Sequence, residues 1–305
     1  MSDLTTTHTS TVTEDQIDHL GHMNVRFYAV NAHAATRAVL ADLPGWGDRD
    51  HFVHDVYTRH LHEQLLGASL AVRSAILDSH SGALRIHHEL VNTETDQLAA
   101  TFVHGLSPLD DDGRRLPLSA EVLAVARERA IPHPAHAATR TISLDSDLMA
   151  NTPSLDVVRE RGLEMRKERL VTEQECDETG AYKVEMAPML TWAGEPVNGQ
   201  EEPLHLLDDG TRMGWASMET RVQMGELPRV GDRVQAFGAA VGVHDKVMHR
   251  VHWTYDLDSG AVLTAFESVS LAFDITNRRP MSIPEAFRQR VEPTIQPDLA
   301  PQALA

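Results

Sequence analysis

A carboxylate, a turn and a helix cap are expected within seven positions, at Asp18, Gly21 and Asn24 respectively. Asparagine is a good N-cap, and the first N–H groups of a helix stabilise negative charge, such as that on an acyl carbonyl oxygen. A carboxylate beside them can act as a general base for water or as a nucleophile. On these residues alone, the simpler interpretation is favoured, in which Asp18 and Asn24 only cap a helix and Gly21 makes a turn.

Composition narrows the class of protein. The chain has 305 residues, enough for two domains, with 42% apolar and 24% charged residues, as in ordinary globular proteins. Its net charge of -18 argues against nucleic acid or an anionic membrane as the main partner. The polar N-terminus and the lack of a long apolar run predict neither a signal peptide nor a membrane span, so we expect a cytoplasmic protein. The one cysteine, Cys176, allows no intrachain disulfide, and we expect it to have a packing role.

An internal repeat organises the chain. The turn DHLGHM (18–23) is followed 159 residues later by DETGAY (177–182). Gly67 and Gly231 are 164 residues apart, as are the strand-like segments LAATF (98–102) and VLTAF (262–266). Ordered landmarks at nearly one offset indicate that a structural unit occurs twice.

Each half has the same predicted order of a short strand, a turn, a helical segment and several long strands. The first helix is predicted at 25–43, with one buried stripe formed by Phe27, Val30, Ala34 and Ala38. Strands are predicted at 68–77, 84–91 and 98–106, and the alternation in 84–91 is typical of a half-buried strand. Their counterparts are 233–243, 246–256 and 261–273. This pattern predicts the α+β class, with an antiparallel sheet and a helix in each half.

The predicted domain boundaries follow from this order. Residues 1–130 form the N-terminal domain, and residues 131–158, which contain three prolines, form a linker. Residues 159–290 form a degenerate C-terminal domain, and the proline-containing residues 291–305 form a flexible tail.

The segment from Asp18 to Tyr28 resembles the D-x-x-G-H-M-N-V-x-x-Y signature of hotdog-fold thioesterases. HLHEQLLGASLAV (60–72) is similar to the Y-L-x-E-x-x-x-G-D segment of the subgroup that includes betainyl-CoA thioesterases, and similar segments follow in order at 84–90, 98–102 and 110–122. The resemblance covers about residues 10–125. It implies a tandem hotdog fold, in which each half wraps a sheet around a central helix, and hydrolysis of a small or medium acyl-CoA without metal or organic cofactor.

Carried over residue by residue, the resemblance implies four catalytic residues. Asp18 matches the motif carboxylate, acting as base or nucleophile, and Glu63 matches the acidic residue of the second segment. Asn24 would position substrate or water, and His22 would hydrogen-bond near the carbonyl. The amides of the turn would meet the thioester carbonyl, and the implied substrate-binding residues are Gly21, Met23, Tyr28, His33, Arg114 and Arg115.

The sequence departs from the family pattern at several positions. His33 stands where many hotdog enzymes carry an acidic residue on the central helix, His60 replaces a tyrosine, and Ala68 replaces an aspartate. These changes put in doubt a mechanism with a helix-borne carboxylate and suggest a different acyl preference.

The second half has lost most of the signature. Asp177 and Gly180 remain, but Ala181 replaces the histidine and Lys183 the asparagine. We expect this half to be mainly structural, with Asp177 and Glu226 as outside catalytic candidates.

Other chemistries lack their motifs. The histidines at 51–62 and 87–88 form no H-E-x-x-H or Cys/His pattern, so no metal is predicted. Phosphate-binding glycine loops and a G-x-S-x-G elbow are also absent from the sequence. The alternatives that remain open are an acyl-ACP thioesterase and a non-catalytic protein that binds acyl-CoA. The resemblance also implies a homodimer or larger homo-oligomer.

Overall fold

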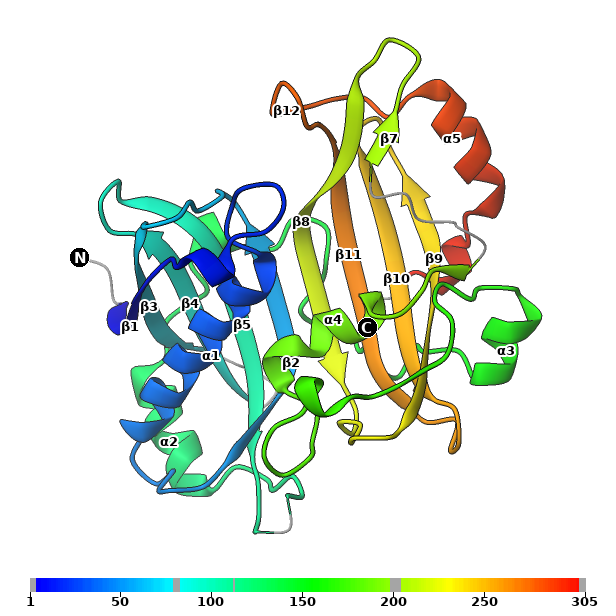
Figure 1. Cartoon of the computed structure of the whole chain (residues 1–305). Helices are drawn as coiled ribbons and strands as arrows, with labels where there is room; N and C mark the ends of the chain where they lie inside the picture. The colour runs from blue at the N-terminus through cyan, green and yellow to red at the C-terminus, as the bar shows by residue number, and fades with distance from the viewer. Residues whose placement is uncertain (1–3, 79–82, 112, 198–203, 302–305) are drawn as a thin grey trace. The chain divides into compact units, whose positions relative to one another are not determined.

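The computed structural model describes residues 4–78, 83–111, 113–197 and 204–301 and divides into two compact units, residues 1–138 and 139–305 (Figure 1). In the first unit an antiparallel sheet has the strand order β1-β3-β4-β5-β2, and the long helix α1 packs on it. Its elements are β1 (Thr5–Thr11), η1 (Glu14–Gln16), α1 (Val25–Ala41), β2 (His51–His60), β3 (Ser69–Leu77), β4 (Leu84–Asn92), β5 (Gln97–Pro108), α2 (Ala120–Arg129) and η2 (Ala135–Ala137).

The second unit repeats this architecture with longer strands, in the order β8-β11-β10-β9-β6. Cys176 is buried there, and burial raises the pKa of its thiol, which agrees with a packing role. The elements are α3 (Leu155–Glu160), β6 (Arg169–Leu170), η3 (Glu173–Glu175), η4 (Val184–Met186), α4 (Ala187–Trp192), β7 (Leu204–Leu206), β8 (Arg212–Met224), β9 (Arg233–Val243), β10 (Val247–Asp256), β11 (Val262–Asp274), β12 (Arg279–Pro280), α5 (Glu285–Val291), η6 (Glu292–Thr294) and η7 (Pro297–Leu299).

Helix α1 begins where the sequence predicts, but it buries a different face. The Asn24 side chain accepts a hydrogen bond from the Arg26 amide at 3.0 Å, which caps the helix. The predicted stripe of Phe27, Val30, Ala34 and Ala38 is only partly buried, and Val30 is 38% exposed. The buried residues are instead Tyr28, Asn31, Ala32, His33, Ala35, Thr36 and Leu40. Most of these side chains are small or polar. The small ones let the helix approach the sheet closely, and the polar ones complete a hydrogen-bond network beneath the helix.

Strand β4 was expected to be half-buried, but both of its faces are covered. His88 points toward α1 and hydrogen-bonds to Thr36, whereas Glu89, on the opposite face, bonds to His136 at 2.6 Å. Glu89 is only 6% exposed. The alternation of polar residues therefore marks a strand between two polar networks, because a later part of the chain returns to cover its outer face.

The internal repeat is reproduced in the backbone of the two turns. The Asp18 amide donates to the His22 carbonyl at 2.9 Å, and the Asp177 amide donates to the Ala181 carbonyl at 2.8 Å. The glycine three positions after each aspartate has a positive φ, 83° and 78°, which a residue with a side chain rarely adopts. The two turns are copies of one structure.

The segments that face these turns also correspond. The Met23 amide donates to the Gln64 carbonyl at 2.8 Å, and the Tyr182 amide donates to the Pro228 carbonyl at 2.9 Å. The loop after β2 therefore corresponds to residues 164 positions further along the chain. The helical segment is the part that differs: α4 has six residues, whereas α1 has 17.

The predicted linker and tail are packed rather than loose. The Ile131 amide donates to the Ile76 carbonyl at 2.9 Å, and the Leu148 amide donates to the Gln223 side chain at 2.7 Å. In the predicted tail, Asp298 pairs with Arg161 at 2.8 Å, and Leu299 packs on the core of the second unit. The expectation of a flexible tail is therefore wrong as far as Pro301, because these apolar and charged side chains find partners; residues 302–305 lie outside the described residues.

A buried chain of hydrogen bonds links α1 to the first sheet. The Thr36 hydroxyl contacts His88 Nε2 at 2.9 Å and His104 Nδ1 at 2.8 Å, and Ser74 contacts His88 Nδ1 at 2.7 Å. The His33 ring lies 4.7 Å from the His104 ring. Burial holds the pKa of all three histidines well below the usual value, so these rings are neutral in the folded protein.

Because its buried histidines are neutral, we expect the folded protein to lose stability in mild acid. An unfolded histidine has a pKa near 6.5, whereas burial lowers the pKa of His60, at the end of β2, to about 4 and holds that of His88 well below its usual value. As the pH falls below about 6.5, the unfolded chain binds more protons than the folded one, and the free energy of unfolding declines. Urea unfolding at pH 7.5, 6.5 and 5.5 measures this slope. His88→Gln should reduce it, and a midpoint that does not change with pH would contradict the assignment.

Candidate functional site

The Asp18 turn holds its carboxylate in a defined position. Asp18 Oδ1 accepts a hydrogen bond from the Leu20 amide at 2.8 Å, and the Gly21 amide donates to the Asp18 carbonyl at 3.0 Å. Asp18 Oδ2 lies 3.4 Å from His22 Nδ1. One oxygen is thus held by the backbone, and the other faces the imidazole.

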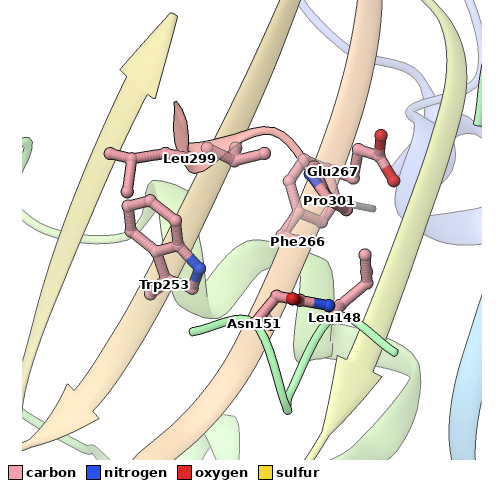
Figure 2. A pocket seen from close by; sticks show the side chains of 9 residues that line it. Leu148, Asn151, Trp253, Phe266, Glu267, Leu299 and Pro301 are labelled. Carbon is pink, nitrogen blue, oxygen red and sulfur yellow. The ribbon is translucent and has the colours of Figure 1, made fainter. Parts of the chain in front are cut away.

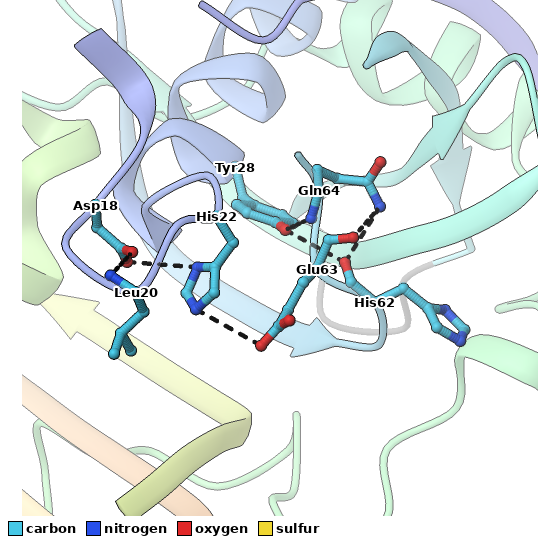
Figure 3. A network of polar contacts seen from close by, with 7 residues as sticks. All are labelled: Asp18, Leu20, His22, Tyr28, His62, Glu63 and Gln64. Atoms are coloured by element: carbon cyan, nitrogen blue, oxygen red, sulfur yellow. Dashed lines mark hydrogen bonds and ion pairs between the residues drawn. The ribbon is translucent and has the colours of Figure 1, made fainter. Parts of the chain in front are cut away.

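His22 lies between two carboxylates. Its Nδ1 atom is 3.4 Å from Asp18, and its Nε2 atom is 3.6 Å from Glu63 Oε1 (Figure 3). The Asp18 and His22 side chains are 15% and 16% exposed, whereas Glu63 is 48% exposed, so Glu63 is the group of the three that water reaches most easily. Three of the predicted catalytic residues are therefore brought together from two segments.

Tyr28 fixes the backbone on both sides of Glu63. Its hydroxyl donates to the His62 carbonyl at 3.2 Å and accepts from the Gln64 amide at 3.0 Å (Figure 3). Burial raises the pKa of Tyr28 to about 12, so the hydroxyl stays protonated. The ring is 4% exposed, which makes Tyr28 a positioning residue rather than the substrate contact predicted from the sequence.

The remaining residues of the motif make mostly structural contacts. Met23 is 1% exposed, and the Asn24 side chain caps α1. The backbone amides of Gly21, Met23 and Asn24 all donate to protein carbonyls. The expectation that these amides meet the thioester carbonyl therefore does not fit the structure. In the described part of the chain, no such acceptor is found for the amides of His22 and Val25, which leaves these two as candidates to polarise a carbonyl.

The structure does not bring the other predicted substrate-binding residues to this site. His33 is buried against His104 beneath α1. Arg115 stacks on Phe52, near the start of β2, at 4.2 Å, and the exposed Arg114 belongs to the same turn. Phe52 and His60 are separated along β2 by about 26 Å, from the usual rise of a strand. The arginines therefore lie at the end of β2 opposite to Glu63.

The repeated turn in the second unit keeps the aspartate and its bond to the backbone but lacks the histidine and the glutamate. Asp177 Oδ1 accepts hydrogen bonds from Thr179 and from the Ala181 amide, and these bonds lower the pKa of Asp177. The histidine position is occupied by Ala181, and the position corresponding to Glu63 is Leu227. The hydrogen bonds of the Asp177 carboxylate to Thr179 and Ala181 stay within its own turn, and Glu226 lies one position before the counterpart of Glu63.

Sequence reasoning missed Gln64. Its side chain is 1% exposed and accepts a hydrogen bond from Asn92 at 2.9 Å, while its backbone joins both Met23 and Tyr28. The only signal in the sequence is that a polar residue stands between Glu63 and two leucines. This signal does not distinguish a buried side-chain amide from an exposed one.

A small pocket in the second unit contains none of the predicted site residues (Figure 2). It lies beside Trp253, Leu299 and the buried Glu267, whose Oε1 is 2.7 Å from His249 Nε2. Among the described residues no group of three or more potential metal ligands is found, and no helix there is long and apolar enough to cross a membrane.

Comparison with solved structures places the fold. The chain is similar to the 12:0-ACP thioesterase from Umbellularia californica, with a TM-score of 0.63 and 9% identity over 89% of this chain and 95% of that chain. An acyl-ACP thioesterase from Bacteroides thetaiotaomicron gives a TM-score of 0.58 and 8% identity, covering 88% of this chain and all of that one. At such low identity these likenesses concern the fold alone, and they confirm the predicted α+β tandem hotdog.

Sequence comparison agrees for the first unit. The betainyl-CoA thioesterase of Pseudomonas aeruginosa is 32% identical over 146 residues, which cover 44% of this chain and 92% of that protein. Residues 12–140 match the model of the thioesterase-like superfamily. The matched region contains Asp18, His22 and Glu63. The chain therefore belongs to the thioesterase-like superfamily and is a thioester hydrolase.

Proposed function

We propose that the chain hydrolyses a small or medium acyl-CoA to the free acid and CoA, using the Asp18, His22 and Glu63 side chains. The observation that carries the proposal is His22 lying between the two carboxylates, at 3.4 and 3.6 Å. The choice of a CoA ester is supported by the relative from Pseudomonas aeruginosa, which is named a betainyl-CoA thioesterase.

In this mechanism Glu63 is the general base. It removes a proton from water while the water oxygen attacks the thioester carbon, which gives a tetrahedral intermediate. The negative oxygen faces the amides of His22 and Val25 near the N-terminus of α1. The intermediate collapses, the carbon–sulfur bond breaks, and the CoA thiolate takes the proton back from Glu63.

Asp18 and His22 act by orientation. Asp18 is less exposed than Glu63, and one of its oxygens is bound by the Leu20 amide, which makes it a poorer base or nucleophile for a substrate arriving from solvent. Asp18 instead holds the His22 ring, and His22 keeps the Glu63 carboxylate in reach of the reacting water.

The first prediction from this mechanism concerns the two carboxylates. Glu63→Gln should lower kcat by about 10²–10⁴-fold, because general-base catalysis contributes this much. Asp18→Asn should lower kcat less, since the amide oxygen can still bind the Leu20 amide while the negative charge beside His22 Nδ1 is lost. Steady-state kinetics with a thiol-detecting reagent measures both.

Asp177→Asn is the matched control, because it makes the same change in the repeated turn that lacks a histidine. It should leave kcat unchanged. Equal losses in Asp18→Asn and Asp177→Asn would point to a folding effect in place of the proposed chemistry, and a Glu63→Gln enzyme with full activity would refute the role of Glu63.

The second prediction concerns Tyr28. Tyr28→Phe leaves the Gln64 amide without its partner, which should lower the free energy of unfolding by about 1–3 kcal/mol. It should also lower kcat more than it changes KM, because Glu63 loses its fixed position while the surface that binds the carrier is untouched. Ala32→Gly, which weakens the same helix without touching Glu63, serves as a control for stability. A Tyr28→Phe enzyme with normal kcat would contradict the positioning role.

The third prediction separates the carriers. A panel of acyl-CoA esters and the corresponding acyl carrier protein esters should show higher kcat/KM for at least one CoA ester. Faster turnover of every carrier-protein ester would favour an acyl-ACP thioesterase. Tight binding of CoA esters with no thiol release by the folded protein would identify a non-catalytic binding protein.

A further inference from the structure

The second unit contains a cluster of buried polar side chains beneath α4. His252, Thr254, Thr264 and Thr191 are all 0% exposed. Within the described residues, neither nitrogen of His252 and none of the three hydroxyl groups has a hydrogen-bond partner. A buried polar group without a partner destabilises the folded state, and native proteins rarely leave several of them together.

The cluster occupies one face of the sheet. Thr254 and Thr264 are directly opposite each other on β10 and β11, and His252 lies two residues before Thr254 on the same face. The Trp192 ring, at the end of α4, packs against the His252 ring at 5.0 Å. Thr191 precedes Trp192. The polar atoms therefore lie between a short helix and two central strands.

The repeat explains how His252 lost its partners. His252 corresponds to His88, which bonds to Ser74 on the neighbouring strand. The strand partner of His252 is Gly238, where any side chain would collide with the His252 ring. The helix partner of His88 is also missing, because Trp192 covers the imidazole in the second unit. The first unit satisfies its histidine internally, whereas the second keeps the histidine without its hydroxyl partners.

Two arginines, Arg166 and Arg250, act on the charge of this cluster. Burial, followed by the charges of Arg250 and Arg166, holds the pKa of His252 well below its usual value, so the ring is neutral and offers one N–H donor. The Arg166 guanidinium also lies over the Trp192 ring at 5.9 Å. Three hydroxyls and one imidazole N–H can supply four hydrogen bonds, and the arginines can offset a negative charge.

We propose that the face of β10 and β11 beneath α4 binds the carboxylate of a small organic acid. A carboxylate has two oxygens that accept about four hydrogen bonds, which matches the four donors, and a buried anion needs nearby cations. The ligand enters when α4 moves aside. This helix has six residues and no side-chain cap at its N-terminus, so it contributes little stability of its own. The inference is independent of thioester hydrolysis in the first unit.

The test uses the full chain and a variant that removes two hydroxyls without changing side-chain shape. For the wild-type protein, acetate, butanoate or succinate at constant ionic strength should raise Tm in a saturable way, and calorimetric titration should give the matching Kd. For Thr254→Val/Thr264→Val, the ligand-free Tm should rise by about 2–4 °C per hydroxyl, because unpartnered polar groups are removed. The carboxylate-dependent shift should be lost.

Thr36→Val is the matched control in the first unit. Its hydroxyl is fully hydrogen-bonded, so this change should lower Tm and leave the carboxylate response intact. Three results would overturn the proposal: no saturable shift with any carboxylate, the same shift in the double variant, or a lower ligand-free Tm in the double variant. A shift with inorganic phosphate but not with carboxylates would also contradict it.

Discussion

The first unit depends on the backbone pairing of the Asp18 turn with the loop after β2. The amide of Met23 donates to the Gln64 carbonyl, and the amide of Gly67 donates to the Val12 carbonyl. These bonds join segments that are far apart in the sequence, and they bring a carboxylate from each to opposite sides of one imidazole. They involve only peptide groups, so the arrangement tolerates changes of side chain. The same pairs of bonds recur in the second unit, although its side chains at the histidine and glutamate positions differ.

Much of the fold could be predicted because local patterns determine it. The β9 range agrees with the prediction at both ends, and α1 begins directly after its predicted cap. The failures have a common cause. The buried face of α1, the second covered face of β4 and the docked end of the chain each depend on what a distant segment supplies. Apolar periodicity identifies a core made of aliphatic residues, and it does not detect a helix face that buries Thr36 and His33 against other polar groups.

The candidate site was predictable to the same extent. The sequence identified Asp18 and His22 because they belong to the family signature. It identified Glu63 because the second matched segment contains it. The structure separates Arg114 and Arg115 from Glu63, and this separation depends on the register of β2 and β5, which a sequence does not reveal. Tyr28 was recognised as part of the signature, but its role was not. Only the structure shows that a phenol on a helix fixes the two peptide groups flanking Glu63.

That phenol has a consequence for how the enzyme responds to its surroundings. With the pKa of Tyr28 raised to about 12, the group that fixes the Glu63 loop neither gains nor loses a proton under ordinary conditions. The hydrogen bonds from Tyr28 to the His62 and Gln64 peptide groups therefore do not depend on pH through Tyr28 itself. Any change of the Glu63 loop with pH must therefore begin in other groups, such as the buried histidines His33, His88 and His104 beneath α1.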